Sequence, residues 1–274
     1  MTDASANVKH ITSRDNPWLK AVRRLSQDAS AYRKQGQVWL EGDHLCRAAL
    51  ARGCEVEEAV FTESAWQQAP ESWRTAAARQ VVLADDLFAG ISGLESPASM
   101  GFVLRLPSAL AIAPLMPTVV LDRVQDAGNV GSILRSASAF GYKQVLALKG
   151  SAALWSPKVL RAGMGAHFGL QLIEGLAAED LEALDIPWLA TSSHQGPYLH
   201  ELVRQQAIPY PCAWLMGHEG QGVRDELMAK ATLTVRIAQP GGEESLNVAA
   251  AAAICLHGAG VRCFFFGVFF FCFF

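Results

Sequence analysis

The sequence predicts an α/β protein whose C-terminal half holds a parallel sheet, preceded by a smaller α/β domain. Three observations favour this fold class. From Thr118 onward, short apolar strands alternate regularly with helices, which is typical of a parallel sheet covered on both faces. Residues 107–117 carry three prolines and no charge, which indicates a linker. Polar loops follow three of the predicted strands, where open α/β sheets bind their ligands.

The composition limits the classes of protein to consider. A chain of 274 residues is long enough for two domains with their own cores. The net charge of −3 excludes a uniformly basic nucleic-acid coat, so any RNA contact requires a local patch. Six cysteines without CxxC or metal-like spacing indicate reduced thiols in a cytoplasmic protein and no metal site. The N-terminus lacks the basic start and apolar core of a secretory signal.

The first domain is expected over residues 1–106. Its predicted elements are a helix beginning after Asn16-Pro17, a strand at 38–40 running into a helix that ends at Leu50, a strand over 55–62, a helix over 66–79, and strands over 81–83 and 100–106.

A basic cluster marks the start of this domain. Residues 1–40 hold seven basic side chains against three acidic ones, although the whole chain is acidic. The candidates for contacts with RNA phosphates are Arg14, Lys20, Arg23 and Arg24. A solvated helix face is the alternative interpretation of such a cluster.

The second domain is expected over residues 118–257. Its predicted strands cover 118–121, 144–148, 170–173, 188–191, 212–216 and 233–237. The predicted helices include one that Gly141 ends, one that Ser156-Pro157 begins, and a last one over 246–256.

The loop and helix after the strand at 118–121 carry the first group of candidate site residues. Asp126 and Asn129 are both good N-cap candidates. The apolar residues of the helix share a face at helical spacing: Ile133, Leu134, Ala137 and Phe140. Asn129, Ser132 and Arg135 follow one another at steps of three and so share another face. An amide, a hydroxyl and a cation would then lie at one edge of the sheet, which predicts a binding site there.

Two later glycine-containing loops follow the last two predicted strands, at residues 217–222 and 238–247. Neither is a GxGxxG after a first strand, and no GxxxxGK(S/T) occurs, so the dinucleotide and P-loop interpretations fail. A single such loop would most simply be a tight turn. Three loops in one domain, each at the end of a strand, indicate a shared site.

Three segments carry a resemblance to a known family, and they occur in the family's order. NVGSILRSASAFG (129–141), MGHEGQGV (216–223) and SLNVAAA (245–251) resemble the three motifs of the SpoU (TrmH-type) RNA 2′-O-ribose methyltransferases of the SPOUT superfamily. ITSRDNP (11–17) and LEG (40–42) resemble the ribosomal-protein-like substrate-binding domain often fused in front. The resemblance implies a parallel sheet with a C-terminal trefoil knot, a homodimer, and S-adenosylmethionine held in the knot by backbone groups.

The resemblance also implies which residues bind the cofactor. These are Thr191, Gly217, Ile237 and Leu246. Glycine at position 217 would let the backbone approach the ligand closely. Ile237 and Leu246 would sandwich the adenine.

The implied catalytic residues are Arg135, Asn129, Glu219, Ser245 and Asn247. Arginine side chains are poor bases, so Arg135 is expected to stabilise the developing ribose alkoxide. The alternative is that packing against a substrate phosphate alters the pKa of its guanidinium group. Asn129 would hold Arg135 or substrate, Glu219 would orient the arginine, and the remaining two would line the pocket. The alternatives are a solvated cation for Arg135 and a turn residue capping the next helix for Glu219.

Two features depart from the family pattern. His218 stands where an asparagine usually precedes the glutamate, and it is expected to offer a hydrogen-bond donor in its place. Residues 258–274 form a Phe-rich tail with eight of the thirteen phenylalanines in the last eleven positions. This tail is shorter than the roughly 20 apolar residues of a membrane span and resembles a frame-altered end, which would favour aggregation or disturb a dimer surface.

The function implied by the resemblance is S-adenosylmethionine-dependent 2′-O-methylation of a ribose in structured RNA. The separate N-terminal domain favours ribosomal RNA over transfer RNA as the substrate. A catalytically inactive RNA-binding or ribosome-assembly module with the same fold is the alternative. The expected partners are RNA and a second copy of the chain, with no membrane and no metal, and the expected location is the cytoplasm.

Overall fold

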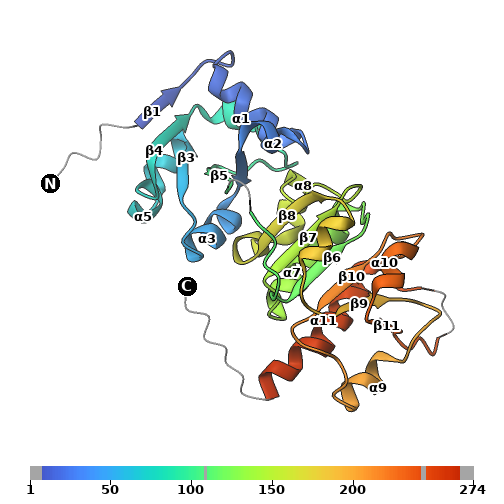
Figure 1. Ribbon diagram of the computed structural model, residues 1–274. Helices are drawn as coiled ribbons and strands as arrows, with labels where there is room; N and C mark the ends of the chain where they lie inside the picture. Colours follow the sequence, from blue (N-terminus) through green and yellow to red (C-terminus); the bar gives the residue numbers. More distant parts are fainter. Residues whose placement is uncertain (1–7, 108–109, 242–244, 266–274) are drawn as a thin grey trace. The chain divides into compact units, whose positions relative to one another are not determined.

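The computed structural model describes residues 8–107, 110–241 and 245–265, with side chains in the last helix as far as Gly260. It divides into two compact units (Figure 1). The first comprises residues 1–109 and 155–168, and the second comprises residues 110–154 and 169–274. The division after residue 109 falls within the predicted linker, and the segment 155–168 packs with the first unit rather than with the second.

A mixed five-stranded sheet forms the centre of the first unit. Its strands lie in the order β1 (Val8–Ile11), β4 (Ala77–Leu83), β3 (Val56–Thr62), β5 (Met100–Arg105) and β2 (Gln37–Glu41). β1, β4 and β3 are parallel, whereas β5 is antiparallel to both of its neighbours. The absence of a Cβ at Gly101 in β5 leaves room for the indole ring of Trp39 in β2.

The helices of the first unit are short. They are α1 (Pro17–Gln27), α2 (Ala31–Gln35), α3 (Asp43–Ala51), α4 (Glu63–Gln68), α5 (Glu71–Arg74), α6 (Asp85–Ala89) and α8 (Pro157–Gly163), followed by a 3₁₀ turn at Ala166–Gly169. α1 begins after Asn16 as predicted, and α8 begins after Ser156. The prediction of one helix over 66–79 is wrong. Pro70 interrupts it, since proline lacks the backbone N–H that a helix needs, and residues from Ala77 onward join β4.

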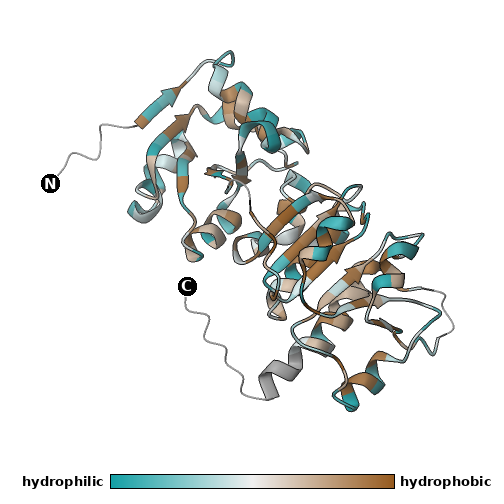
Figure 2. Cartoon of the chain, in the orientation of Figure 1, coloured by the Kyte–Doolittle hydropathy of each residue, from teal (hydrophilic) through white to brown (hydrophobic). Residues whose placement is uncertain are grey.

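The second unit is built on a six-stranded sheet in which every neighbouring pair is parallel, as predicted. Its order is β11 (Leu233–Val235), β9 (Trp188–Thr191), β10 (Ala213–Met216), β6 (Thr118–Leu121), β7 (Gln144–Leu148) and β8 (Gln171–Leu176). The central strands β10, β6 and β7 are buried along their whole length, and they are mostly brown in the hydropathy colouring of Figure 2. Val120, Leu146 and Leu215 pack on one face against a core that includes Leu227.

Four α-helices accompany this sheet: α7 (Ala127–Ala139), α9 (Leu199–Arg204), α10 (Asp225–Lys230) and α11 (Val248–Phe265). A 3₁₀ turn lies at Glu179–Ala183. Asp126 is the N-cap of α7, and its Oδ1 accepts a hydrogen bond from the Asn129 backbone N–H at 2.7 Å. The helix ends just before Gly141, which has the positive φ of 86° expected of a C-terminal glycine.

α11 differs from its prediction at both ends. Asn247 caps it, so Leu246 lies outside the helix, and the helix continues to Phe265 rather than ending at Leu256. The beginning of the Phe-rich tail, at Gly258 and Ala259, is buried within this helix. Residues 266–274 of that predicted tail lie outside the described part of the chain. Within the part described, no helix is long and apolar enough to cross a membrane.

Candidate active site

Three polar segments of the second unit meet through a chain of side-chain hydrogen bonds. Glu219, from the loop after β10, accepts a hydrogen bond on Oε1 from the Asn129 side-chain amide at 3.2 Å. Asn129 lies in the first turn of α7 and accepts on Oδ1 from the side-chain amide of Asn247 at 3.0 Å. β6 and β10 are parallel neighbours, so their loops lie at the same edge of the sheet. The structure thus brings together one predicted residue from each motif.

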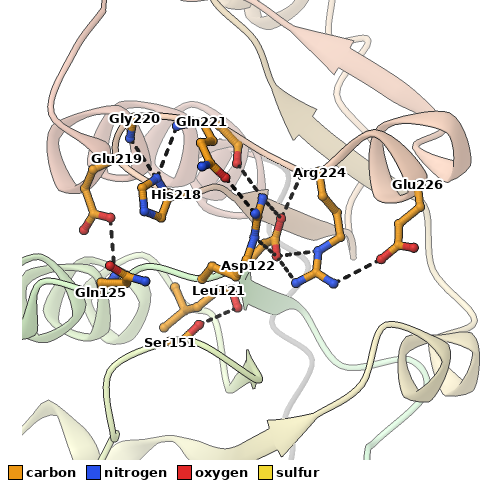
Figure 3. Close-up of polar contacts among 12 residues, drawn as sticks. Leu121, Asp122, Gln125, Ser151, His218, Glu219, Gly220, Gln221, Arg224 and Glu226 are labelled. Carbon is orange, nitrogen blue, oxygen red and sulfur yellow. Dashed lines mark hydrogen bonds and ion pairs between the residues drawn. The ribbon is translucent and has the colours of Figure 1, made fainter.

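Glu219 also receives hydrogen bonds from the loop after β6. Its carboxylate accepts from the backbone N–H groups of Gln125 at 3.3 Å and Asp126 at 3.1 Å, and Figure 3 shows it directed toward Gln125. Partial burial acts to raise the pKa of Glu219, but the hydrogen bonds from its own backbone, Asn129 and this loop outweigh burial and lower that pKa. Glu219 is therefore a carboxylate at neutral pH. It holds the two loops together rather than capping the following helix.

Asn247 fixes the other end of this chain. Its Oδ1 accepts from the backbone N–H groups of Ala249 at 2.9 Å and Ala250 at 3.3 Å, which makes it the N-cap of α11. The oxygen is used by the helix, and the Nδ2 group is left to donate to Asn129. Only an asparagine combines both functions in a side chain of this size.

His218 stabilises the turn of the second motif. Its Nδ1 accepts from the backbone N–H groups of Gly220 at 3.0 Å and Gln221 at 3.2 Å, as Figure 3 shows. The imidazole thus accepts hydrogen bonds through Nδ1 in this turn, and the predicted donor role of His218 stays a prediction. An asparagine oxygen makes the same hydrogen bonds in an Asx turn, which explains physically how histidine replaces it.

Gly217 lies directly after β10 and is buried. A Cβ at this position would overlap the backbone of Gly222 and of Val223. The glycine is thus required by the closure of its own loop, a reason that the sequence did not supply. Backbone groups of Gly217 remain at the end of the strand, where ligands of α/β sheets bind.

The other predicted cofactor residues follow the ends of neighbouring strands. Thr191 ends β9 and its hydroxyl donates to the Leu215 carbonyl at 3.4 Å. Ile237 lies two residues beyond β11 and is half-buried. Leu246 is 39% exposed although it is a large apolar residue. Because β11, β9 and β10 are neighbours in the sheet, Thr191 and Ile237 lie along the same edge as Gly217.

Arg135 is exposed on α7, two turns beyond Asn129. No residue in the described ranges makes a hydrogen bond or ion pair with its guanidinium group. The predicted contacts from Asn129 and Glu219 to this arginine are not present, because those two side chains bond to each other. Ser245 is exposed and begins the last described segment.

The structure also shows a group that sequence reasoning missed. Asp122, directly after β6, is fully buried and forms an ion pair with Arg224, which precedes α10, at 2.6 Å. An aspartate at the end of an apolar strand was the available signal. Its partner lies 102 residues away, so no local pattern could identify it.

The four residues predicted to contact RNA lie in the first unit, and they differ in whether their side chains already bond to other protein groups. Arg14 forms an exposed ion pair with Asp86 at 3.0 Å, and Lys20 forms one with Asp15 at 3.1 Å. Arg23 donates through Nε to the Gly90 carbonyl at 2.7 Å. Arg24, also on α1, is exposed. Its side chain makes no hydrogen bond or ion pair within the part of the chain that the structure describes.

Among the residues described, no three His, Cys, Asp or Glu side chains gather closely enough to hold a metal ion. The hydrogen-bonded network consists of amides and one carboxylate at the carboxyl edge of a parallel sheet. An arrangement of this kind is typical of α/β proteins that bind a small organic ligand.

Comparison with known proteins gives the family. The SpoU rRNA Methylase family matches residues 116–257, and an MRM3-like substrate binding domain matches residues 16–101. The chain belongs to the SpoU rRNA Methylase family.

Some relatives cover nearly the whole chain and others about three-fifths of it. The 23S rRNA (guanosine(2553)-2′-O)-methyltransferase RlmP of Bacillus subtilis is 28% identical over 253 residues, which is 91% of this chain and 98% of the relative. The human mitochondrial rRNA methyltransferase 3 is 31% identical over 172 residues, 59% of this chain and 40% of the relative. A crystal structure of an AdoMet-bound rRNA methyltransferase from Sinorhizobium meliloti has a TM-score of 0.77 and 25% identity, covering 93% of this chain and 98% of that one.

Proposed function

We propose that this protein transfers the methyl group of S-adenosylmethionine to a ribose 2′-oxygen in structured ribosomal RNA. The observation that carries the proposal is the hydrogen-bonded chain from Glu219 through Asn129 to Asn247, which joins the family's three motifs at one edge of the sheet. Arg135, on the same helix as Asn129, is free to meet a substrate.

The cofactor supplies an electrophilic methyl group when bound. The residues proposed to hold it are Thr191, Gly217, Ile237 and Leu246. They fit such a ligand because Leu246 and Ile237 leave apolar surface uncovered near a strand end, where an adenine ring would bury it. Backbone groups at Gly217 would bind polar parts of the cofactor without interference from a side chain.

Arg135 would act on the charge that develops as the ribose hydroxyl loses its proton. A guanidinium group remains charged in proteins and donates hydrogen bonds in a planar fork, which suits an alkoxide or an adjacent phosphate. Asn129 and Asn247 would position the ribose beside it, with Ser245 lining the same pocket. Glu219 would keep Asn129 in place through the hydrogen bond between them.

Ribosomal RNA is preferred over transfer RNA because the first unit matches a substrate-binding domain and because RlmP of Bacillus subtilis acts on 23S rRNA. An inactive assembly module with the same fold remains the second candidate. The retained polar chain favours the enzyme, since an inactive module would have no need of Asn247 Nδ2 bonded to Asn129.

The trefoil knot, the homodimer and the cytoplasmic location stay predictions that follow from the family. The end of β11 is hydrogen-bonded to the segment at the start of α9. Arg236 N–H donates to the Pro197 carbonyl at 3.0 Å, and Leu199 N–H donates to the Arg236 carbonyl at 2.7 Å. Two stretches of the C-terminal half, far apart in sequence, therefore run beside each other.

The test is methyl transfer to RNA that lacks the modification. Purified protein, labelled S-adenosylmethionine and ribosomal RNA from a strain deleted for the enzyme are expected to give one alkali-resistant 2′-O-methylated dinucleotide. Transfer RNA from the same strain serves as the competing substrate. Binding of ribosomal RNA without any transfer would favour the assembly module instead.

A further inference from the structure

Asp122 joins the two loops that carry the proposed active site. Its backbone N–H donates to the carbonyl of Met216, the last residue of β10, at 2.8 Å. Its Oδ2 accepts from the Arg224 backbone N–H at 2.9 Å, and its Oδ1 accepts from the Arg224 Nε at 2.8 Å. Figure 3 shows this pair with Arg224 reaching on to Glu226. The contact fixes the start of the loop after β6 to the end of the loop after β10.

A second arginine completes the contact. Arg123 donates through Nε to Asp122 Oδ1 at 3.2 Å and through Nη1 to Gln221 Oε1 at 2.9 Å. Its φ of 60° is uncommon for a residue other than glycine and costs about 1 kcal/mol or more. The backbone at this position is therefore held in place by surrounding contacts.

The carboxylate depends on these partners. Burial acts to raise the pKa of Asp122, but the hydrogen bonds from Arg224 and Arg123 outweigh it and lower that pKa. A buried carboxylate that lost its arginine would be an uncompensated charge, so the surrounding loops would have to move to admit water.

A second contact, between Asn129 and Glu219, joins the same two loops. Seven residues after Asp122 comes Asn129, which bonds to Glu219, and five residues after Glu219 comes Arg224. Each loop is thus tied at both of its ends to the other loop. Asp122 itself is 0% exposed and cannot touch a substrate.

We infer that Asp122 and Arg224 are positioning residues for methyl transfer, which hold the loops so that Glu219 and Asn129 stay hydrogen-bonded. This inference rests on the proposed function. Loosening the ion pair should displace Asn129 and the first turn of α7 with it. The chemical step should then slow while Thr191 at the end of β9 and Ile237 beyond β11 keep their places.

The test uses Arg224→Lys and Asp122→Asn, with Glu226→Gln as the matched control. Glu226 bonds the outer face of Arg224 at 3.0 Å and is exposed, so its loss should leave transfer unchanged. Lysine keeps the charge and the backbone N–H but not the planar fork. We expect single-turnover transfer to fall at least ~10-fold in both variants, with S-adenosylmethionine affinity changed by less than ~3-fold.

A double-mutant cycle distinguishes positioning from a general loss of stability. Arg224→Lys and Glu219→Ala should each slow transfer, and the double variant should be no slower than the slower single one, because each is expected to lose the hydrogen bond between Glu219 and Asn129. Multiplicative effects, or an unchanged rate in Arg224→Lys, would overturn the inference. If the unmodified protein transfers no methyl group, the proposed function fails and the inference with it. Arg224→Lys keeps the hydrogen bond from its backbone N–H to Asp122, so this variant still provides the test if Asp122→Asn does not fold.

Discussion

The side-chain amide of Asn247 donates a hydrogen bond to Asn129 Oδ1 at 3.0 Å across 118 residues of sequence. The same Asn247 caps α11 with its oxygen. One residue therefore fixes both the start of the last helix and the orientation of the amide that faces Glu219. The site can be dissected by changing one atom of this side chain at a time.

Asn247→Asp replaces the donor by an acceptor and keeps the cap. Transfer should fall about 10-fold because the Asn129 oxygen loses its donor and meets a negative charge. Thermal stability should hardly change, whereas Asn247→Ala should cost about a further 1 kcal/mol through loss of the cap. Single-turnover rates and melting curves of both variants measure the two effects. An aspartate variant as active as the unmodified protein would show that the contact between the asparagines is dispensable.

Gly217→Ala should abolish S-adenosylmethionine binding because its Cβ would displace the backbone at Gly222 and so deform the loop. Gly220 is the matched control in the same loop. A Cβ there would lie 3.8 Å from the His218 ring, an ordinary contact, so Gly220→Ala should bind normally. Calorimetric titration compares the two. Equal affinities would remove Gly217 from the cofactor site.

The stability contributed by Asp122 should depend on pH in one direction. Its pKa is lowered in the folded protein, so the contribution is complete above the ordinary carboxyl value of about 4 and is lost as pH falls through the lower folded pKa. At pH 7 Asp122→Asn should be less stable by on the order of 2 kcal/mol. The melting temperatures of the two proteins should approach each other as pH falls below about 4. A gap that stays constant below that pH would contradict this assignment.

The two arginines of α1 should have different functions: Arg24 should contact RNA, and Arg23 should stabilise the fold. Arg24 is exposed and free within the described ranges, so Arg24→Ala should weaken RNA binding and reduce its salt slope by about one unit. Arg23 bonds the Gly90 carbonyl, so Arg23→Ala should lower thermal stability instead. Filter binding at several salt concentrations tests both. An unaltered slope in Arg24→Ala would leave the helix as a solvated face.

Local patterns were sufficient for much of the fold. The alternation of strands and helices predicted the parallel sheet, and the Asp126 and Gly141 positions predicted both ends of α7. The single helix predicted over 66–79 is divided by Pro70, and its last residues pair in β4 instead. Mixed pairing in the first sheet depends on contacts between distant strands, which spacing along the chain does not contain.

The site was predictable as a set of residues but not as a network. The motifs indicated Asn129, Glu219 and Asn247, yet the bonds among them join positions at least 90 residues apart. The position of Asp122 after an apolar strand did not reveal its role, and Arg224 gave no local signal, since the burial of the aspartate and its ion pair exist only in the folded sheet. The acceptor role of His218 likewise depends on the turn that it closes.

Arg135 is proposed to act on the ribose during methyl transfer, and variants of this arginine test that role. Single-turnover transfer to unmodified ribosomal RNA is compared for the unmodified protein, Arg135→Ala, Arg135→Lys, and Arg204→Ala as an exposed arginine on another helix. Arg135→Ala should bind cofactor normally and transfer at least ~10²-fold more slowly, with poor rescue by lysine and no effect at Arg204. Transfer by Arg135→Ala at the unmodified rate would contradict the account and make this arginine a solvated cation.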